Sequence, residues 1–206
     1  MTWRKRIFDL FFASLLVVIL GPIILFLILL IWRKQGHPIF YVAERMKTPT
    51  DSFGLVKFRT MTVVNDDAGV SGGDKDARIT PLGARLRAKR LDEFPQLWNI
   101  LRGDLSFVGP RPPLREYVER FPDIYAKVLK SRPGVTGLAT IRFHKHEERL
   151  LARCNSARET DAVYCRICVP RKARLDLIYQ RNQNTCYDFD LVFQTIGNLF
   201  RRNPSG

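Results

Sequence analysis

The chain has 206 residues and carries 34 Lys and Arg against 20 Asp and Glu, which gives a formal net charge of +14 at neutral pH. Its length accommodates a membrane element and a single domain of ordinary size, which we expect to be catalytic. The excess of positive charge indicates an anionic partner, which composition alone leaves open among nucleic acid, an acidic lipid surface and a phosphorylated substrate.

The first predicted element is a membrane segment. Residues 7–32 are apolar apart from Asp9 and Ser14. At a rise of ~1.5 Å per residue, a straight helix of this length would cross the hydrocarbon core of a bilayer. The apolar run is too long for a signal peptide, and no small-x-small cleavage pattern follows it. We therefore predict a membrane segment over residues 1–35 and a cytoplasmic catalytic domain over residues 36–206.

The charges at its two ends suggest that this segment does not cross the bilayer. Basic residues 4–6 precede it, and Arg33 and Lys34 follow it, so both ends have the character of cytoplasmic flanks. Pro22, after Gly21, lacks an N–H group and clashes with the preceding turn, which predicts a sharp bend. We expect a re-entrant helix that enters and leaves on one side. The alternative is a tilted, proline-kinked spanning helix.

A β-hairpin is predicted next to the membrane segment. Residues 39–42 and 55–60 are β-prone, and a turn-rich stretch over residues 47–52 separates them. Alternation along the second strand places Lys57 and Arg59 on one face. These two cations would either contact a phosphate or form an ordinary solvated strand face.

A loop and a helix lead towards a pair of carboxylates. Residues 65–75 are rich in Asp and Gly without periodicity, which predicts a loop, and their spacing does not match a calcium-binding loop. Thr80 and Pro81 then form a helix start, with Thr80 as the N-cap. This helix carries several arginines, Arg87 among them, towards Asp92.

Asp92 and Glu93 are predicted to lie at the N-terminus of a further helix. An apolar stripe at helical spacing follows them: Phe94, Leu97, Trp98 and Leu101. The helix macrodipole and the neighbouring arginines would favour ionised carboxylates, and an ionised carboxylate is what a nucleophile or a magnesium ligand requires. The alternative is that Asp92 is a simple N-cap and Glu93 a first-turn charge.

Helices also dominate the remainder of the chain. We predict them over residues 112–121, 122–130, 170–181 and 188–202, the last capped by Asp188. Their mixed apolar and charged faces suit either helices that pack on the core or interfacial amphipathic helices. The predicted fold class is therefore α+β and mostly helical, with a re-entrant membrane helix and a small β-hairpin.

The cysteines and histidines of the last third give weak signals. The cysteines are Cys154, Cys165, Cys168 and Cys186. A Cys-x-x-Cys pair is half of a zinc site, but no second pair completes it, so reduced thiols of a cytosolic domain are the simpler interpretation. His144 and His146 alternate as on a strand or loop, and we expect them at the surface.

Four motifs occur in order and carry a resemblance to a known family. They are residues 57–61 (KFRTM), 91–97 (LDEFPQL), 103–112 (GDLSFVGPRP) and 132–137 (RPGVTG). The set resembles the bacterial sugar transferases, the monotopic polyprenyl-phosphate phosphoglycosyl transferases, from about residue 4 to residue 139 and again from about residue 174. Residues 141–170 depart from the shorter family pattern, as an insertion that we expect to influence sugar choice.

The resemblance implies a reaction and a location. Such enzymes transfer a sugar 1-phosphate from a UDP-sugar to undecaprenyl phosphate, through a covalent aspartyl phosphosugar, and give undecaprenyl-diphosphate-sugar and UMP. This is the first membrane step of exopolysaccharide, O-antigen or glycoprotein glycan assembly. It takes place at the cytoplasmic face of the bacterial inner (plasma) membrane, in contact with membrane lipids.

The resemblance also assigns roles to residues. Asp92 would be the nucleophile and a ligand of Mg²⁺, and Glu93 would support it. The positions matched to substrate phosphate binding are Lys57, Arg59, Arg87, Arg111 and Asp176. We expect no nucleic-acid partner, and a homo-oligomer is compatible with the sequence.

A non-enzymatic alternative is a membrane-tethered basic protein that binds anionic lipid or nucleic acid. It explains the charge and the membrane segment. It does not explain a carboxylate pair close to Pro110-Arg111-Pro112.

Overall fold

The structure is a computed structural model that describes residues 2–62 and 78–200, without the side chains of Leu199 and Phe200. The loop predicted over residues 65–75 lies outside the described residues. The described chain is mostly helical and contains a small antiparallel sheet, as predicted.

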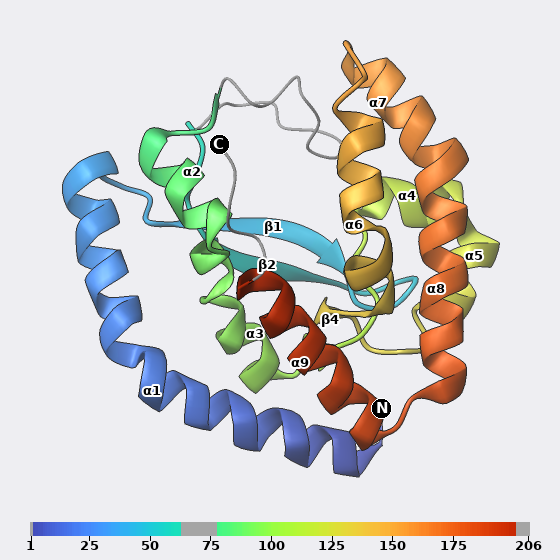
Figure 1. Ribbon diagram of the computed structural model, residues 1–206, viewed down its shortest axis with the longest axis horizontal. Coiled ribbons are helices and arrows are strands. Elements are labelled where there is room, and N and C mark those ends of the chain that lie inside the picture. Colours follow the sequence, from blue (N-terminus) through green and yellow to red (C-terminus); the bar gives the residue numbers. More distant parts are fainter. Residues whose placement is uncertain (1, 63–77, 201–206) are drawn as a thin grey trace.

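The first element is α1 (Trp3–Gln35), a helix of 33 residues. It is the one helix among the described residues that is long and apolar enough to cross a membrane. Figure 1 shows that α1 bends partway along, so that its two arms run along two sides of the remaining chain. Pro22 is the proline inside this helix, and its missing N–H group gives the bend a physical cause. The predicted bend is present, whereas re-entry into a membrane stays a prediction.

The predicted hairpin is confirmed. Strands β1 (Phe40–Met46) and β2 (Ser52–Phe58) pair antiparallel, with Phe40 opposite Phe58. One face of β2 presents Phe53 and Leu55 to a hydrophobic cluster that includes Ala13 of α1. The hairpin is therefore packed directly against the long apolar helix.

Helix α2 (Pro81–Ala88) begins as predicted. The Thr80 hydroxyl accepts a hydrogen bond from the Gly83 N–H at 2.9 Å, and Pro81 occupies the first turn. A Cβ atom at Gly83 would lie 2.0 Å from the Thr60 carbonyl oxygen. Only glycine therefore lets α2 pack this closely against the end of the hairpin.

The carboxylate pair does not start a helix, contrary to the prediction. Leu91–Glu93 forms a short 3₁₀ turn, η2, and α3 (Gln96–Arg102) begins after Pro95. Ile100 is fully buried, whereas Trp98 of the predicted stripe is 60% exposed. The reason is that α3 also directs a polar residue, Asn99, towards the interior. The Asn99 side chain accepts a hydrogen bond from the Val56 N–H at 3.0 Å and donates one to the Gly54 carbonyl at 2.8 Å.

A second, parallel pairing was not predicted. Strands β3 (Ser106–Val108) and β4 (Gly134–Thr136) lie side by side, and a Cβ at Gly134 would come within 2.2 Å of the Gly109 nitrogen. Asp9 of α1 accepts hydrogen bonds from the Ser106 hydroxyl at 3.0 Å and the Phe107 N–H at 3.2 Å. The N-terminal arm of α1 is thereby fixed to β3.

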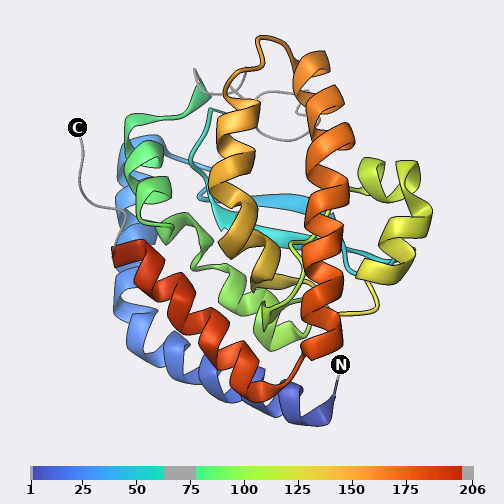
Figure 2. The same ribbon diagram turned by 45° about the vertical axis from the view of Figure 1, so that its right-hand side comes forward.

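Helices form the rest of the described chain. They are α4 (Arg115–Arg120), α5 (Pro122–Val128), α6 (Leu138–Leu151), α7 (Ala157–Val163), the π-helical turn η3 (Tyr164–Cys168), α8 (Val169–Asn182) and α9 (Thr185–Phe200). The two views show α6 and α8 side by side and α9 lying along α1 (Figures 1 and 2). The rings of Phe8 on α1 and Phe189 on α9 meet edge to face, with their centroids 4.8 Å apart. His144 and His146 lie on α6, so their predicted strand or loop is wrong.

A buried ion pair joins the first helix to the last. Lys5 Nζ lies 2.6 Å from Asp188 Oδ2, and the Tyr179 hydroxyl donates to Asp188 Oδ1 at 2.7 Å. Asp188 was predicted as the N-cap of the last helix, but α9 begins at Thr185 and Asp188 points into the protein instead. The competing interaction is this tertiary contact, whose partner lies 183 positions earlier in the sequence.

We expect Lys5→Met to lower the free energy of unfolding by about 3–5 kcal/mol, because it leaves the Asp188 carboxylate buried without its cation. Thermal and denaturant unfolding in detergent measure this. The matched control is Lys34→Met, whose side chain is exposed at the other end of α1. Combining Lys5→Met with Asp188→Leu should recover part of the loss, and a parent-like Lys5→Met would contradict the assignment.

Candidate active site

The carboxylate pair is presented by an unusual backbone turn. Arg90 has φ of 53°, in the left-handed region that residues with a side chain seldom adopt. It separates α2 from η2, and the Glu93 N–H donates to the Arg90 carbonyl at 3.2 Å. This turn reverses the chain so that Asp92 and Glu93 face the hairpin.

Three cations converge on Glu93. Its Oε1 lies 3.4 Å from Lys57 Nζ and 3.8 Å from Arg111 Nη2, and its Oε2 lies 3.7 Å from Arg90 Nη1. Burial acts to raise the pKa of Glu93, but Lys57, Arg111 and Arg90 together hold that pKa below its ordinary value. Glu93 is therefore a permanently charged centre that holds the cations together.

Lys57 depends on this arrangement. Burial lowers the pKa of its ammonium group, the Glu93 carboxylate opposes that shift, and Arg111 adds to it. The pKa of Lys57 is lowered overall, and the carboxylate of Glu93 favours the charged form of this lysine close to an arginine. A charged lysine and arginine held this way form a ready site for an anion.

Asp92 differs from its neighbour. Its side chain is buried, and burial raises its pKa, with Lys57 and Arg87 opposing the shift and Glu93 adding to it. The more basic carboxylate is the better nucleophile, and the cations favour its ionised form. The two neighbouring carboxylates therefore differ: the pKa of Glu93 lies below its ordinary value, and that of Asp92 lies above it.

A pocket opens on the Oε1 side of Glu93. It is lined by Lys57, Arg111, Gln96 and Arg45, with Gly134 and Val135 of the β4 strand among the remaining lining residues. Lysine and arginine side chains only donate hydrogen bonds, and phosphate oxygens only accept them. We call this the cationic pocket, and its chemistry suits a phosphate or diphosphate.

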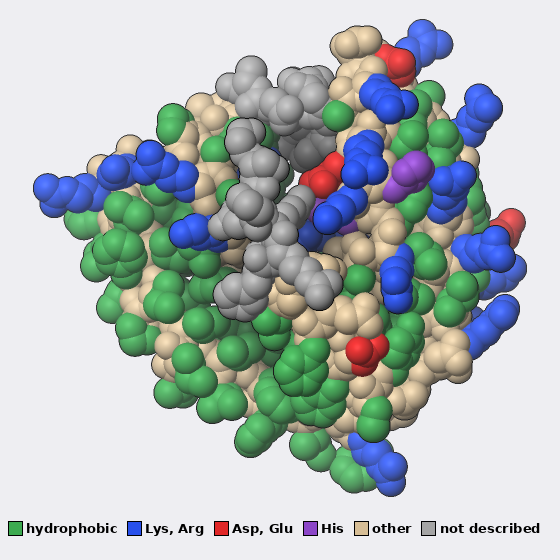
Figure 3. Space-filling view, viewed as in Figure 1, with side chains coloured by type: hydrophobic (Ala, Val, Ile, Leu, Met, Phe, Trp, Pro, Cys, Tyr) green, Lys and Arg blue, Asp and Glu red, His purple; other side chains and the backbone are tan. Residues whose placement is uncertain are grey.

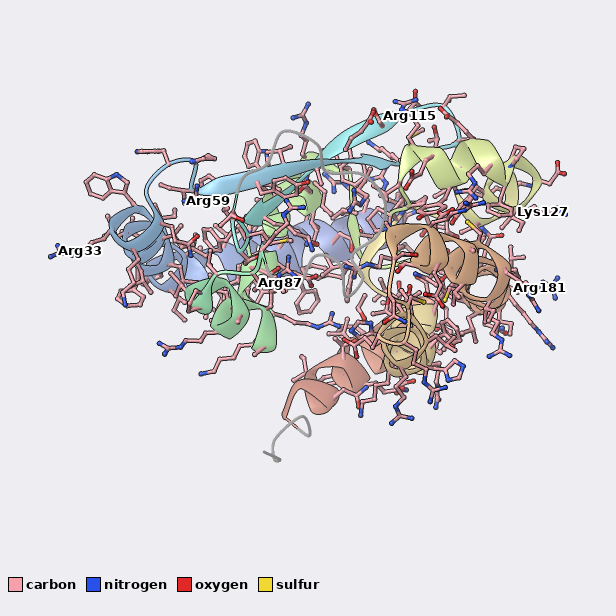
Figure 4. All side chains as sticks on the ribbon, turned by 90° about the horizontal axis from the view of Figure 1, so that it is seen from above. Arg33, Arg59, Arg87, Arg115, Lys127 and Arg181 are labelled. Atoms are coloured by element: carbon pink, nitrogen blue, oxygen red, sulfur yellow. The ribbon has the colours of Figure 1, made fainter. Side chains whose placement is uncertain are left out.

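The predicted site residues are brought together only in part. Arg87 Nε donates to the Thr60 hydroxyl at 2.9 Å, and its charge acts on Asp92, so it faces the site. Arg59 instead donates to the carbonyls of His37 and Gly36 at 3.0 Å each and to that of Gln35, and Figure 4 shows it beside the end of α1. Its role as a phosphate ligand stays a prediction that this placement does not support.

Asp176 also lies apart from the carboxylate pair. It is buried on α8, where burial raises its pKa to about 7 and the nearby Lys172 opposes the shift. Lys172 itself donates to Glu147 at 2.9 Å and to the Tyr164 hydroxyl at 3.2 Å. The assignment of Asp176 to phosphate binding stays a prediction.

Sequence reasoning missed two residues that the structure brings to the site. Arg90 was one of several basic residues in a row, and only its left-handed backbone singles it out. The charges of Arg90 and Arg111 both act to lower the pKa of His144 on α6. No local signal places a residue of α6 there, because the contact depends on tertiary packing. Figure 3 shows a hollow beside α6 where acidic, basic and histidine side chains meet.

Comparison with known proteins agrees with the motifs. The family described as bacterial sugar transferase matches residues 1–202. The uncharacterized sugar transferase EpsL of Bacillus subtilis is 42% identical over 66% of this chain and 67% of its own length. The UDP-glucose:undecaprenyl-phosphate glucose-1-phosphate transferase of Klebsiella pneumoniae is 33% identical over 93% of this chain but only 39% of its own length. The exopolysaccharide production protein ExoY of Rhizobium meliloti is 32% identical over 93% of this chain and 83% of its own length.

We expect Asp176→Asn to stabilise the protein more at pH 8 than at pH 5. The native pKa of about 7 lies above the ordinary 3.8, so between these values the unfolded chain ionises first and stability falls as pH rises. The variant removes this loss, which is on the order of a few kcal/mol. Melting temperatures at both pH values measure it, with the exposed Asp123→Asn as control. An equal gain at both pH values would contradict the buried acid.

Proposed function

Because the chain belongs to the bacterial sugar transferase family, we propose that it transfers a sugar 1-phosphate from a UDP-sugar to undecaprenyl phosphate and releases UMP. The single observation that carries this proposal is the buried Asp92 next to Glu93, whose carboxylate holds three cations, one of which, Lys57, also acts on Asp92. The name of the Klebsiella pneumoniae relative states the same reaction class with glucose.

The first step is a displacement at the phosphorus that bears the sugar. An oxygen of the Asp92 carboxylate attacks this phosphorus, and the bond from it to the bridging diphosphate oxygen breaks. UMP leaves with that electron pair, and an aspartyl phosphosugar remains. A covalent intermediate splits one transfer between a soluble donor and a lipid acceptor into two simpler steps.

In the second step, a phosphate oxygen of undecaprenyl phosphate attacks the same phosphorus. The bond to Asp92 breaks, the carboxylate is restored, and the product is undecaprenyl-diphosphate-sugar. Lys57, whose charge acts on Asp92, and Arg111 line the cationic pocket and would bind the charge on the leaving and entering phosphates. Glu93 keeps these cations in place without reacting.

Mg²⁺ is part of the proposal. Among the described residues, no three His, Cys, Asp or Glu side chains form a metal-binding group. Mg²⁺ is nevertheless commonly held by one carboxylate together with substrate phosphates, and Asp92 offers that carboxylate. When bound, the ion would neutralise charge on the diphosphate.

The proposed location is the cytoplasmic face of the bacterial inner membrane, with α1 as a re-entrant helix. Much of α1 exposes large apolar side chains, and Phe193 of α9 is 67% exposed. Figure 3 shows hydrophobic side chains covering the lower left of this face, over α1, while Lys and Arg gather on the right. Such a surface suits a protein that rests partly in lipid.

We expect Asp92→Asn to lower UMP release from UDP-sugars by about 10³-fold or more, because an amide is a poor nucleophile. The assay contains undecaprenyl phosphate and Mg²⁺ in detergent. The control Asp123→Asn should match the parent. Parent-like activity of Asp92→Asn would remove the nucleophile assignment, and a folded parent inactive on every UDP-sugar would favour a non-enzymatic basic tether.

A topology experiment tests the re-entrant helix. We expect reporter tags placed before Met1 and after Gly206 to be protected from protease in spheroplasts and cleaved in inverted membrane vesicles, because basic residues flank both ends of α1. Cleavage of the N-terminal tag alone in spheroplasts would show a spanning helix instead.

A further inference from the structure

A second cavity lies beside Arg90, the residue from which the Asp92–Glu93 turn begins. It opens between α6, α9 and the turn, and its lining includes Arg90, Thr140, His144, Lys145, Thr195 and Asn198. Figures 1 and 2 show α9 passing close to the lower end of α6 in both views. These side chains come from three parts of the chain that only tertiary packing brings together. We call it the α6–α9 cavity.

Arg90 connects this cavity to the reactive carboxylates. Its guanidinium contacts Glu93 Oε2, whereas Lys57 and Arg111 contact Oε1 and line the cationic pocket. Each of the two hollows is therefore lined by at least one cation that contacts Glu93, the residue directly after Asp92. A substrate centred on Asp92 can extend into both of them.

The two hollows differ in hydrogen-bonding character. The polar side chains of the cationic pocket are donor-only cations apart from Gln96. The α6–α9 cavity mixes donors with acceptors. Thr195 donates its one hydroxyl proton to the Leu191 carbonyl at 2.8 Å, so the 2.7 Å contact with Thr136 is donated by Thr136. Both threonine oxygens thus keep accepting capacity.

His144 adds a further acceptor. Burial lowers the pKa of His144, with Arg90 and Arg111 adding to that shift and Glu148 opposing it, which favours the neutral ring. Its Nε2 lies 3.2 Å from Glu148 Oε1, and a neutral ring that donates its Nε2 proton to this carboxylate has Nδ1 as an acceptor. Asn198 supplies both a donor and an acceptor.

A phosphate group can use only donors, whereas each hydroxyl of a sugar both donates and accepts. We propose that the α6–α9 cavity is the subsite for the sugar of the nucleotide sugar, with Thr140, Lys145 and Asn198 in contact with its hydroxyl or acylamino groups. This inference rests on the proposed function, since it assigns the sugar end of that substrate. It places the diphosphate in the cationic pocket and the phosphorus under attack at Asp92, between the two.

The test compares Thr140→Val and Lys145→Met with the parent over a panel of UDP-glucose, UDP-galactose and their N-acetylamino counterparts. Thr140→Val removes a hydroxyl at nearly constant volume, and Lys145 is exposed enough to change without harm to folding. We expect the ratio of kcat/KM between the preferred sugar and its epimer to change by about tenfold or more. The KM for undecaprenyl phosphate should stay as in the parent.

The matched control is Arg142→Gln, which removes an exposed cation of the same helix that does not line the cavity. It should leave the sugar ratios unchanged. Unchanged ratios in Thr140→Val and Lys145→Met would overturn the proposal. A raised KM for undecaprenyl phosphate at constant ratios would also overturn it and assign the cavity to the lipid acceptor.

A binding measurement separates failure of the subsite from failure of the proposed function. In the Asp92→Asn background, Lys145→Met should weaken binding of the preferred UDP-sugar in calorimetry and leave binding of UMP unchanged. If the parent protein transfers no sugar phosphate but Lys145→Met still weakens UDP-sugar binding selectively, the subsite proposal stands and the proposed reaction is wrong. Equal weakening for UMP and UDP-sugar would overturn the subsite.

Discussion

The charge of Glu93 is the interaction on which the site depends. Lys57 comes from β2, Arg90 from the turn after α2, and Arg111 from the segment after β3, and these cations would repel one another without a carboxylate between them. In a partly buried site such repulsion is several times stronger than in water. Glu93 therefore fixes the relative positions of three chain segments as well as their charge.

The same constraint explains why two adjacent carboxylates have different properties. Cations contact both oxygens of Glu93, which holds its pKa below the ordinary value, while burial leaves the pKa of Asp92 raised. Glu93 is engaged by cations, and in the proposed reaction the neighbouring Asp92 is the carboxylate that attacks phosphorus. A single acid could not serve both purposes, since reaction would remove the charge that holds the cations.

Local signals in the sequence were sufficient for the hairpin, the Thr80 cap and the bend at Pro22, because each depends on neighbouring residues. The four motifs in order, through their resemblance to a family, predicted Asp92, Glu93, Lys57 and Arg111 as site residues. The β3–β4 pairing and the link from Lys5 to Asp188 join distant segments and leave no local pattern. The proximity of His144 to Arg90 also joins distant segments, so no local pattern predicts it. Strand alternation placed Arg59 on the same face as Lys57, but β2 ends at Phe58, so the alternation does not extend to Arg59.

The placement of Arg59 also shows how α1 and the site are coupled. The C-terminal end of α1 is held by Arg59, which directly follows the strand that carries Lys57. The N-terminal arm is held through Asp9 to β3, which leads through Gly109 and Pro110 into Arg111. Each arm of the bent helix is thus tied to a strand that supplies one site cation. In the proposed membrane location, where α1 lies in lipid, these ties would hold the cationic pocket at a fixed height relative to the bilayer, within reach of the proposed lipid phosphate.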